Sequence, residues 1–376
     1  KDENGKDIVD QEKVNELVDY AIEHGVNFFD TAPVYLQGQS ETAMGIALKR
    51  HPRDKFFIAT KMSNPRIPDF KRSVEMYRNS MKNLQVDYID YYLLHSIGGG
   101  KGIETFKERF IYNGLLDFLL KEREAGRIRN LGWSFHGDVA TFDYVLSMDV
   151  KWDFAMIQLN YVDWRHASRN NHAEYLYNEL AKRNIPVNIM EPLLGGRLAK
   201  MSDHLVARLK QRRPEDSVAS WAFRFAGHHP GVLTVLSGMT YKEHLQDNLK
   251  TFSPHVPLTD EELEFLEETA QIYKQYPIVD CNDCKYCMPC PYGIDIPGIL
   301  LHYNKCVNEG SVPKNSQDPN YREARRKYLV SYDRTVEKLR QADHCTNCGQ
   351  CNEHCPQRIN IPKEIDRIDK FIEQLK

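Results

Sequence analysis

Short apolar runs alternate with longer amphipathic stretches from residue 8 onwards. The apolar runs are GVNFFDTA, KFFIATKM, YIDYYLLHS, IRNLGWSF, FAMIQLNY, IPVNIMEPL and GVLTVLSGM. Each run is entered from a stretch with helical spacing, such as VNELVDYAIEHG or VEMYRNSMKNLQ. Because runs that stay apolar on consecutive residues indicate strands buried on both faces, the pattern predicts seven strands of a parallel sheet covered by helices.

Two arrangements of such a sheet compete, an open doubly wound sheet and a closed barrel. The first visible run is not followed by G-x-G-x-x-G, which argues against an open dinucleotide-binding sheet. A polar residue stands at or near the carboxyl end of each run, where a barrel builds its active site. These residues are Asp30, Lys61, His95, Ser134, Gln158, Glu191 and Ser237. We therefore predict an α/β fold, a (β/α)8 TIM barrel, whose first strand is expected before Lys1.

The alternation stops after about residue 250. The stretch PLTDEELEFLEETAQIYKQ predicts a helix that begins at Thr-Asp-Glu-Glu. Beyond it, YREARRKYLVSYDRTVEKLRQ also has helical spacing. The predicted organisation is a barrel over residues 1–252, a connecting helix over 253–277, and a small, mostly helical, ferredoxin-like domain over 278–376.

The composition of the chain argues against nucleic acid and membranes as partners. The chain has 376 residues, 41% of them hydrophobic, and a formal net charge of -3 with both signs scattered. That balance provides no basic face for nucleic acid, and the apolar runs are far shorter than a membrane-spanning helix. No signal peptide is visible, so we expect a cytoplasmic protein.

All nine cysteines lie between Cys281 and Cys355. An odd number at two-residue intervals is a poor disulfide framework, whereas thiolates gathered around metal fit this spacing and imply a reducing compartment. The second group is Cys345, Cys348, Cys351 and Cys355, followed by Pro356. It matches the C-x2-C-x2-C-x3-C-P run of bacterial ferredoxins.

The first group is Cys281, Cys284, Cys287 and Cys290, followed by Pro291, and it has two residues instead of three before the last cysteine. Both groups end in Cys-Pro followed by I-x-I-P, which indicates one shared role. Zinc also takes four thiolates, but a zinc ribbon separates two C-x2-C pairs by a longer loop. We predict two [4Fe-4S] clusters.

The fourth cysteine of such a run commonly serves the other cluster. On that basis one cluster is held by Cys281, Cys284, Cys287 and Cys355, and the other by Cys345, Cys348, Cys351 and Cys290. Cys306 is left over and is expected to be a buried small residue.

The stretches FDTAPVYLQGQSE, ATKM and YYLLHS together resemble the aldo-keto reductase family. The resemblance covers roughly residues 8–250 and implies an active site made of Asp30, Tyr35, Lys61 and His95. With the cysteine region, the whole chain looks like the ferredoxin-tailed branch of that family. The implied substrate is a small carbonyl or alcohol.

The implied roles are chemically consistent. Hydride addition to a carbonyl leaves an alkoxide, and Tyr35 would protonate it. A phenol titrates near pH 10, so it needs a neighbour such as the Lys61 ammonium that favours phenolate. Asp30 would keep Lys61 charged, and His95 would donate a hydrogen bond to the carbonyl oxygen.

The same resemblance implies a nicotinamide site. Ser134 and Gln158 would hold the carboxamide, and Met190 stands where many members stack a Tyr. Gly238 and His244 replace the Lys and Arg that grip the 2′-phosphate in many members that use NADPH, so the choice between NADH and NADPH stays open. The cofactor motif is otherwise represented by Ser237, Met239 and Asn248, and backbone amides there can bind phosphate at a helix start.

A nicotinamide moves two electrons as hydride, whereas each cluster accepts one at a time, so a converter is needed between them. Either a flavin, the natural candidate, occupies the barrel mouth, or the substrate itself passes through a radical. The clusters would serve a redox protein partner. The alternative is an electron-transfer or binding module whose barrel has lost carbonyl reduction.

Overall fold

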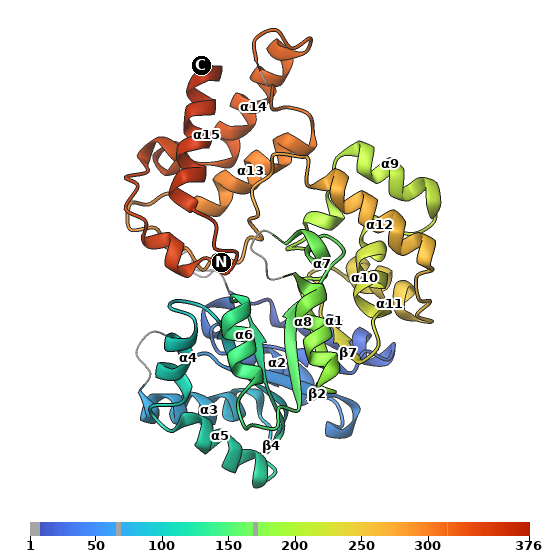
Figure 1. The fold of residues 1–376 in the computed structure, drawn as a ribbon, viewed down its shortest axis with the longest axis vertical. Coiled ribbons are helices and arrows are strands. Elements are labelled where there is room, and N and C mark those ends of the chain that lie inside the picture. Colours follow the sequence, from blue (N-terminus) through green and yellow to red (C-terminus); the bar gives the residue numbers. More distant parts are fainter. Residues whose placement is uncertain (1–7, 65–68, 168–171, 314) are drawn as a thin grey trace. The chain divides into compact units, whose positions relative to one another are not determined.

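The computed structural model describes residues 8–64, 69–167, 172–313 and 315–376 (Figure 1). The chain forms two compact units. Unit 1 contains residues 1–159, 167–190 and 226–257, and unit 2 contains residues 160–166, 191–225 and 258–376. The units interleave along the chain, whereas the boundaries predicted at residues 252 and 277 are linear. Those boundaries stay a prediction.

Unit 1 is built on a seven-stranded parallel sheet in sequential strand order. Its strands are β1 (Phe28–Asp30), β2 (Phe57–Met62), β3 (Ile89–Ile97), β4 (Ile128–Phe135), β5 (Phe154–Gln158), β6 (Val187–Met190) and β7 (Val232–Val235). Six lie within their predicted runs, and β3 extends one residue beyond its run, to Ile97. The prediction of seven parallel strands is confirmed. Along β3 only Tyr91 and Ser96 are not fully buried, as expected for a strand covered on both faces.

Helices alternate with these strands and surround the sheet. In unit 1 they are α1 (Gln11–Glu23), α2 (Ser40–Leu48), α3 (Phe70–Leu84), α4 (Ile103–Phe110), α5 (Leu115–Glu124), α6 (Val139–Leu146), α8 (Ala173–Lys182) and α11 (Lys242–Phe252). Their boundaries follow local chemistry. The Asp69 side chain accepts a hydrogen bond from the backbone N–H of Arg72 at the start of α3, and Gln85 ends that helix in the left-handed conformation.

Side chains fill the interior of the sheet. Ala59, Leu93, Phe154 and Met156 form a buried cluster, against which Met190 packs. Close strand packing also explains one glycine, because a Cβ on Gly132 would lie 2.4 Å from the carbonyl oxygen of Phe154. The fold is a nearly closed parallel barrel with a packed core. Within the described residues β1 pairs only with β2, and β7 only with β6; the eighth strand stays an expectation.

Four helices of unit 2 come from the interleaved segments and from the predicted connecting region. They are α7 (Asp163–His166), α9 (Asp203–Arg212), α10 (Val218–His228), whose last three residues belong to unit 1, and α12 (Asp260–Tyr273). A capping box begins α12, since the backbone N–H of Thr259 donates to Glu262 and the backbone N–H of Glu262 donates to the Thr259 hydroxyl. The predicted helix start is confirmed.

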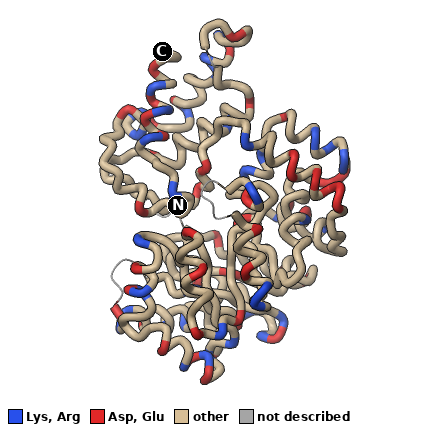
Figure 2. The backbone as a smooth tube through the Cα atoms, viewed as in Figure 1, with Lys and Arg blue, Asp and Glu red and all other residues tan. Residues whose placement is uncertain are grey.

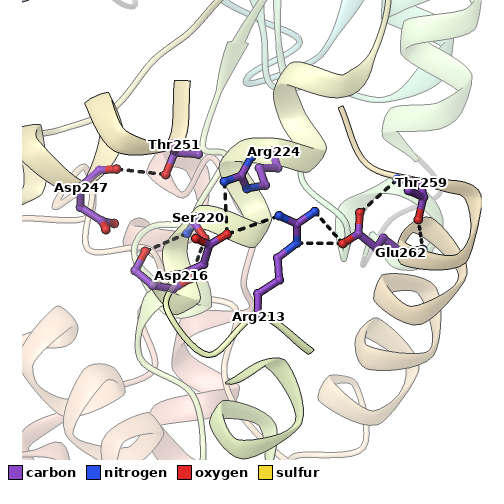
Figure 3. Close-up of polar contacts among 9 residues, drawn as sticks. Arg213, Asp216, Ser220, Arg224, Asp247, Thr251, Thr259 and Glu262 are labelled. Carbon is purple, nitrogen blue, oxygen red and sulfur yellow. Dashed lines mark hydrogen bonds and ion pairs between the residues drawn. The ribbon is translucent and has the colours of Figure 1, made fainter. Parts of the chain in front are cut away.

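An ion-pair network ties this start of α12 to the segment before α10 (Figure 3). The Arg213 guanidinium lies 2.6 Å from Glu262 Oε1 and 3.6 Å from Asp216 Oδ2, and Arg224 donates to the same Asp216 oxygen at 3.2 Å. Charges of both signs are interspersed along the chain (Figure 2).

The rest of unit 2 is mostly helical, as predicted. Its helices are α13 (Ile296–Asn308), α14 (Tyr321–Thr335) and α15 (Ile361–Leu375). They pack around one core that includes Ile299, Tyr328 and Ile368. Cys306 lies in this core at 2% exposure, which confirms the expected buried cysteine. In the part of the chain that is described, no helix has the length and apolarity needed to cross a membrane.

Candidate functional site

A buried ion pair lies at the carboxyl ends of β1 and β2. Asp30 is the last residue of β1, and Lys61 lies one residue before the end of β2. The Lys61 Nζ donates to Asp30 Oδ2 at 2.5 Å and to the carbonyl oxygen of Thr31 at 2.8 Å. Lys61 is only 1% exposed, so its charge depends on these partners.

Tyr35 and His95 complete the group. Tyr35 begins a short 3₁₀ turn (Tyr35–Gly38), and the Lys61 Nζ lies 4.9 Å from the centroid of its ring. The His95 ring, from β3, lies 5.8 Å from the Tyr35 ring at an interplanar angle of 79°. The structure thus brings together the four residues predicted for catalysis, all within unit 1.

Burial sets the charge states of two of these groups. Burial raises the pKa of the Asp30 carboxyl, and the adjacent Lys61 ammonium opposes that change. Burial lowers the pKa of His95 well below its ordinary value, and Lys61, His136 and Arg109 lower it further by repulsion. His95 is therefore a neutral imidazole at physiological pH, suited to donate a hydrogen bond rather than to give up a proton.

Three residues beside His95 were missed in the sequence. Ser63 Oγ lies 2.5 Å from His95 Nδ1, and the Arg109 guanidinium donates to the His95 carbonyl oxygen at 2.7 Å. His136 directly follows β4, and burial together with Lys61 lowers its pKa to about 4. Ser63 and His136 each directly follow a strand, and this position in the sequence could have marked them as candidate site residues. Arg109 lies on α4, where no sequence signal marked it.

The residues predicted near the nicotinamide lie on three neighbouring strands: Ser134 and Gln158, predicted to hold the carboxamide, and Met190, at the position where many members stack a Tyr. Ser134 is on β4 and accepts a 2.8 Å hydrogen bond from the backbone N–H of Ser96. Gln158 ends β5 and Met190 ends β6, and these two residues are paired in the sheet register. All three therefore lie at the carboxyl edge that also carries Lys61.

The residues predicted for the phosphate end lie around the turn between β7 and α11. Asn248 donates a 3.0 Å hydrogen bond to the Ser237 hydroxyl, which ties the turn to the helix. A Cβ on Gly238 would meet open space, and Met239 packs against the apolar cluster beneath α11. His244 lies in the first turn of α11 with its ring 5.3 Å from that of Tyr241.

The two cysteine groups have left-handed backbone conformations at matching positions. Asp283 and Lys285 have φ of 58° and 62°, and the equivalent Asn347 and Gly349 have φ of 56° and 75°. After the last cysteine of each group the match continues, because Gly293 and Arg358 are both left-handed, at 78° and 49°. Each group then runs into a helix, α13 or α15, that begins with Pro in its first turn. The repeated motif of the sequence is thus also a repeated structure.

One cavity of unit 2 is lined by cysteines from both groups. The lining cysteines are Cys281, Cys284, Cys287 and Cys355, and the apolar walls come from Ile296, Pro297, Leu300, Ile359 and Ile361. Burial and the neighbouring thiols raise the pKa of Cys284 and of Cys287 to about 12, and Cys355 contributes to both shifts. Cys351 has different neighbours, since Cys348, Cys345 and Cys290 help burial to raise its pKa to about 11.

In the described residues, no three His, Cys, Asp or Glu side chains come close enough to hold a single metal ion. The backbone N–H of Ile359 donates to Cys355 Sγ at 3.4 Å.

The first cysteine loop is anchored within unit 2 by the segment that follows β6. Asn282 donates a hydrogen bond to Glu191, and Arg197 donates to Asp280 at 2.9 Å. Burial raises the pKa of Glu191 to about 7, and Asp163 adds to that rise. The Gly195 backbone lies so close that an added Cβ would be 2.2 Å from the Asn282 Cβ.

Known sequences that resemble this chain were found by a family model and by pairwise comparison. Residues 3–271 match the sequence model described as "Aldo/keto reductase family". Aldo-keto reductase YhdN of Bacillus subtilis is 35% identical over 134 residues, which cover 33% of this chain and only 38% of that relative. Protein tas of Escherichia coli is 25% identical over 315 residues, covering 69% of this chain and 89% of the relative.

Solved structures share the fold. An aldo-keto reductase from Klebsiella pneumoniae in complex with NADPH superimposes with a TM-score of 0.56 at 22% identity, covering 72% of this chain and 87% of the other. An aldo-keto reductase from Bacillus halodurans in its holo form gives a TM-score of 0.56 at 24% identity, covering 70% and 88%.

Proposed function

Because the chain belongs to the aldo/keto reductase family, we propose that unit 1 reduces a small carbonyl substrate, or oxidises the corresponding alcohol, by hydride exchange with a nicotinamide cofactor. The observation that carries this proposal is the contact set of Asp30, Lys61, Tyr35 and His95. Each of these side chains alone has a structural explanation, such as packing. Together they supply the acid and the hydrogen-bond donor that carbonyl reduction needs.

Each of the four residues has a separate role in the proposed reaction. When bound, the nicotinamide supplies hydride to the carbonyl carbon. Tyr35 donates a proton to the oxygen, and the nearby Lys61 ammonium favours the phenolate that remains. Asp30 fixes Lys61 in place, and His95, being neutral, donates a hydrogen bond that orients and polarises the carbonyl.

The cofactor site is proposed around the carboxyl ends of β4 to β7, with Ser134, Gln158 and Met190 near the nicotinamide. Ser237, Gly238, Met239, His244 and Asn248 would line the phosphate end. The NADPH in the Klebsiella structure supports a nicotinamide dinucleotide here. Since no Lys or Arg stands at positions 238 and 244, we expect NADH to be accepted as well.

We further propose that the cysteine groups hold two [4Fe-4S] clusters, which makes the chain a member of the ferredoxin-tailed branch. The cavity lined by Cys281, Cys284, Cys287 and Cys355 supports one site. Cys290, Cys345, Cys348 and Cys351 would form the other. Each cluster would carry single electrons for a redox partner protein.

Two measurements test the proposal. The first follows oxidation of NADPH and of NADH with a panel of small aldehydes and ketones, and turnover above the rate without substrate is expected. The second determines iron and acid-labile sulfide in anaerobically purified protein, with eight of each per chain expected for two [4Fe-4S] clusters. Colourless protein that contains zinc in place of iron would refute the clusters. Clusters without carbonyl turnover would favour the electron-transfer module instead.

A further inference from the structure

A buried hydroxyl, that of Ser63, contacts one of the two ring nitrogens of His95. Ser63 follows β2 and His95 lies on β3, and each residue is 6% exposed. Their Oγ and Nδ1 atoms are 2.5 Å apart. Nδ1 is thereby engaged, while Nε2 makes no hydrogen bond to the described residues and remains available to a substrate.

The direction of this hydrogen bond decides what His95 can do. A neutral imidazole carries one proton, and the partner of one nitrogen determines which of the two holds it. If Ser63 donates, the ring proton stays on Nε2 and can be offered to a carbonyl oxygen. If Ser63 accepts, Nε2 has only a lone pair and cannot polarise a carbonyl.

The surroundings favour Ser63 as the donor. If Ser63 accepted the proton of Nδ1, its own hydroxyl proton would need a second acceptor. Within the described residues Ser63 has no other hydrogen bond, so that proton would be buried without a partner. Donation to Nδ1 satisfies both groups at once.

Arg109 fixes the spacing of the pair from the side of the backbone. Its Nε donates to the Asn64 carbonyl oxygen at 3.1 Å, and its Nη2 donates to the His95 carbonyl oxygen at 2.7 Å. One rigid guanidinium therefore ties the residue after Ser63 to the backbone of His95. Burial lowers the pKa of Arg109 only to about 10, so the guanidinium stays charged at neutral pH.

We propose that Ser63 is a positioning residue that donates its hydroxyl proton to Nδ1 of His95 and so keeps the ring proton on Nε2, where it meets the substrate oxygen. This inference rests on the proposed carbonyl chemistry of unit 1. Ser63 acts through His95 and does not itself contact the reacting atoms.

The test is a direct reading of the tautomer. In protein labelled with ¹⁵N-histidine, two-bond ¹H–¹⁵N correlation spectra distinguish a protonated Nε2 from a protonated Nδ1, and a His95→Gln variant identifies the signal. We expect the Nε2–H form in the wild type, a mixture in Ser63→Ala, and restoration in Ser63→Thr. Ser80→Ala is the matched control, because Ser80 is a buried serine whose hydroxyl has no hydrogen-bond partner among the described residues.

In parallel, turnover of an accepted carbonyl should fall about ten- to a hundredfold in Ser63→Ala, with KM nearly unchanged, since a hydrogen-bond donor to the developing alkoxide is weakened rather than removed. A wild type protonated on Nδ1, or a Ser63→Ala variant with an unchanged tautomer, overturns the inference. The spectra need no turnover. An inactive wild type with the expected tautomer change would therefore refute the proposed reaction and leave the role of Ser63 in place.

Discussion

The Lys61 ammonium lies 2.5 Å from the Asp30 carboxylate, and the side chains are 1% and 14% exposed. A charge this deeply buried is stable only while its partner remains. The pair therefore has a structural consequence besides its place in the candidate site, and that consequence can be measured without any substrate.

Replacing Asp30 by Asn should lower the free energy of unfolding by about 3–5 kcal/mol, because it leaves the Lys61 charge buried and uncompensated. Lys61→Met should cost less, since it removes the cation and leaves Asp30, whose pKa burial already raises, free to take up a proton. Urea denaturation of both variants measures whether Asp30→Asn loses more unfolding free energy than Lys61→Met.

Asp19→Asn is the control, because Asp19 pairs with Arg50 and His51 in a more exposed setting. It should cost no more than about 1 kcal/mol. Equal losses for Asp30→Asn and Asp19→Asn would mean that burial of the Lys61 pair has no energetic weight.

Replacing Tyr35 by Phe should lower the turnover of any accepted carbonyl by roughly 10²–10⁴, the usual contribution of a positioned general acid. Substrate KM and cofactor affinity should change little, because the ring and its contact with Lys61 remain. Steady-state and binding measurements separate these quantities. Tyr112→Phe removes the hydroxyl of an exposed tyrosine and should leave turnover unaltered; full activity in Tyr35→Phe would rule Tyr35 out as the acid.

The sequence predicted the strands because each is a continuous apolar run. Polar residues at strand ends predicted which edge of the sheet holds the site, whereas the choice of the catalytic four, including Tyr35, came from the resemblance to the aldo-keto reductase family. It did not predict the partner of His95. That contact depends on how the chain turns after β2 and on the side-chain rotamer of Ser63, and neither has a code in the residue pattern. The interleaving of the two units was missed for a similar reason, since nothing in residues 191–225 marks them as part of unit 2 rather than of the barrel.

The proposed ligand sets, in which each [4Fe-4S] cluster takes its fourth cysteine from the other cysteine group, predict which variants lose the same cluster. Cys355→Ala and Cys287→Ala should lose the same cluster, because both residues line one cavity. Cys351→Ala should lose the other cluster. Iron content and the electron paramagnetic resonance spectrum of the reduced protein report the loss. The double variant Cys287→Ala/Cys355→Ala should resemble either single variant, and Cys306→Ala should keep the iron of the wild type.

His302 should make the protein less stable in mild acid. It packs against Tyr328 and Tyr332, and burial lowers its pKa to about 4. As the pH falls from about 6.5, the unfolded chain takes up a proton that the folded His302 does not, so stability is lost until the pH reaches about 4. At pH 5 this difference amounts to roughly 2 kcal/mol.

A His302→Gln variant cannot protonate at this position, so its stability should fall less than that of the wild type between pH 7 and pH 5. Unfolding curves at the two pH values measure the difference. A proton NMR titration should show the His302 ring neutral above pH 5. A ring that titrates near pH 6.5 would contradict the prediction.

The segment after β6 offers a matched pair of glycines for testing how the first cysteine loop is held. Gly195 and Gly196 both have positive φ, at 67° and 86°, but an added Cβ at Gly195 would strike Asn282, whereas one at Gly196 would meet nothing within 4 Å. Gly196→Ala should therefore cost only the backbone penalty of about 1–2 kcal/mol. Gly195→Ala should cost a further 1–3 kcal/mol or so, because it overpacks the contact that places Asn282 beside Glu191.

Denaturation midpoints measure the loss of stability in both variants. Loss of iron to a chelator should also be faster in Gly195→Ala than in Gly196→Ala. If the two variants behave alike, the close approach of this segment to Asn282 does not exist in solution.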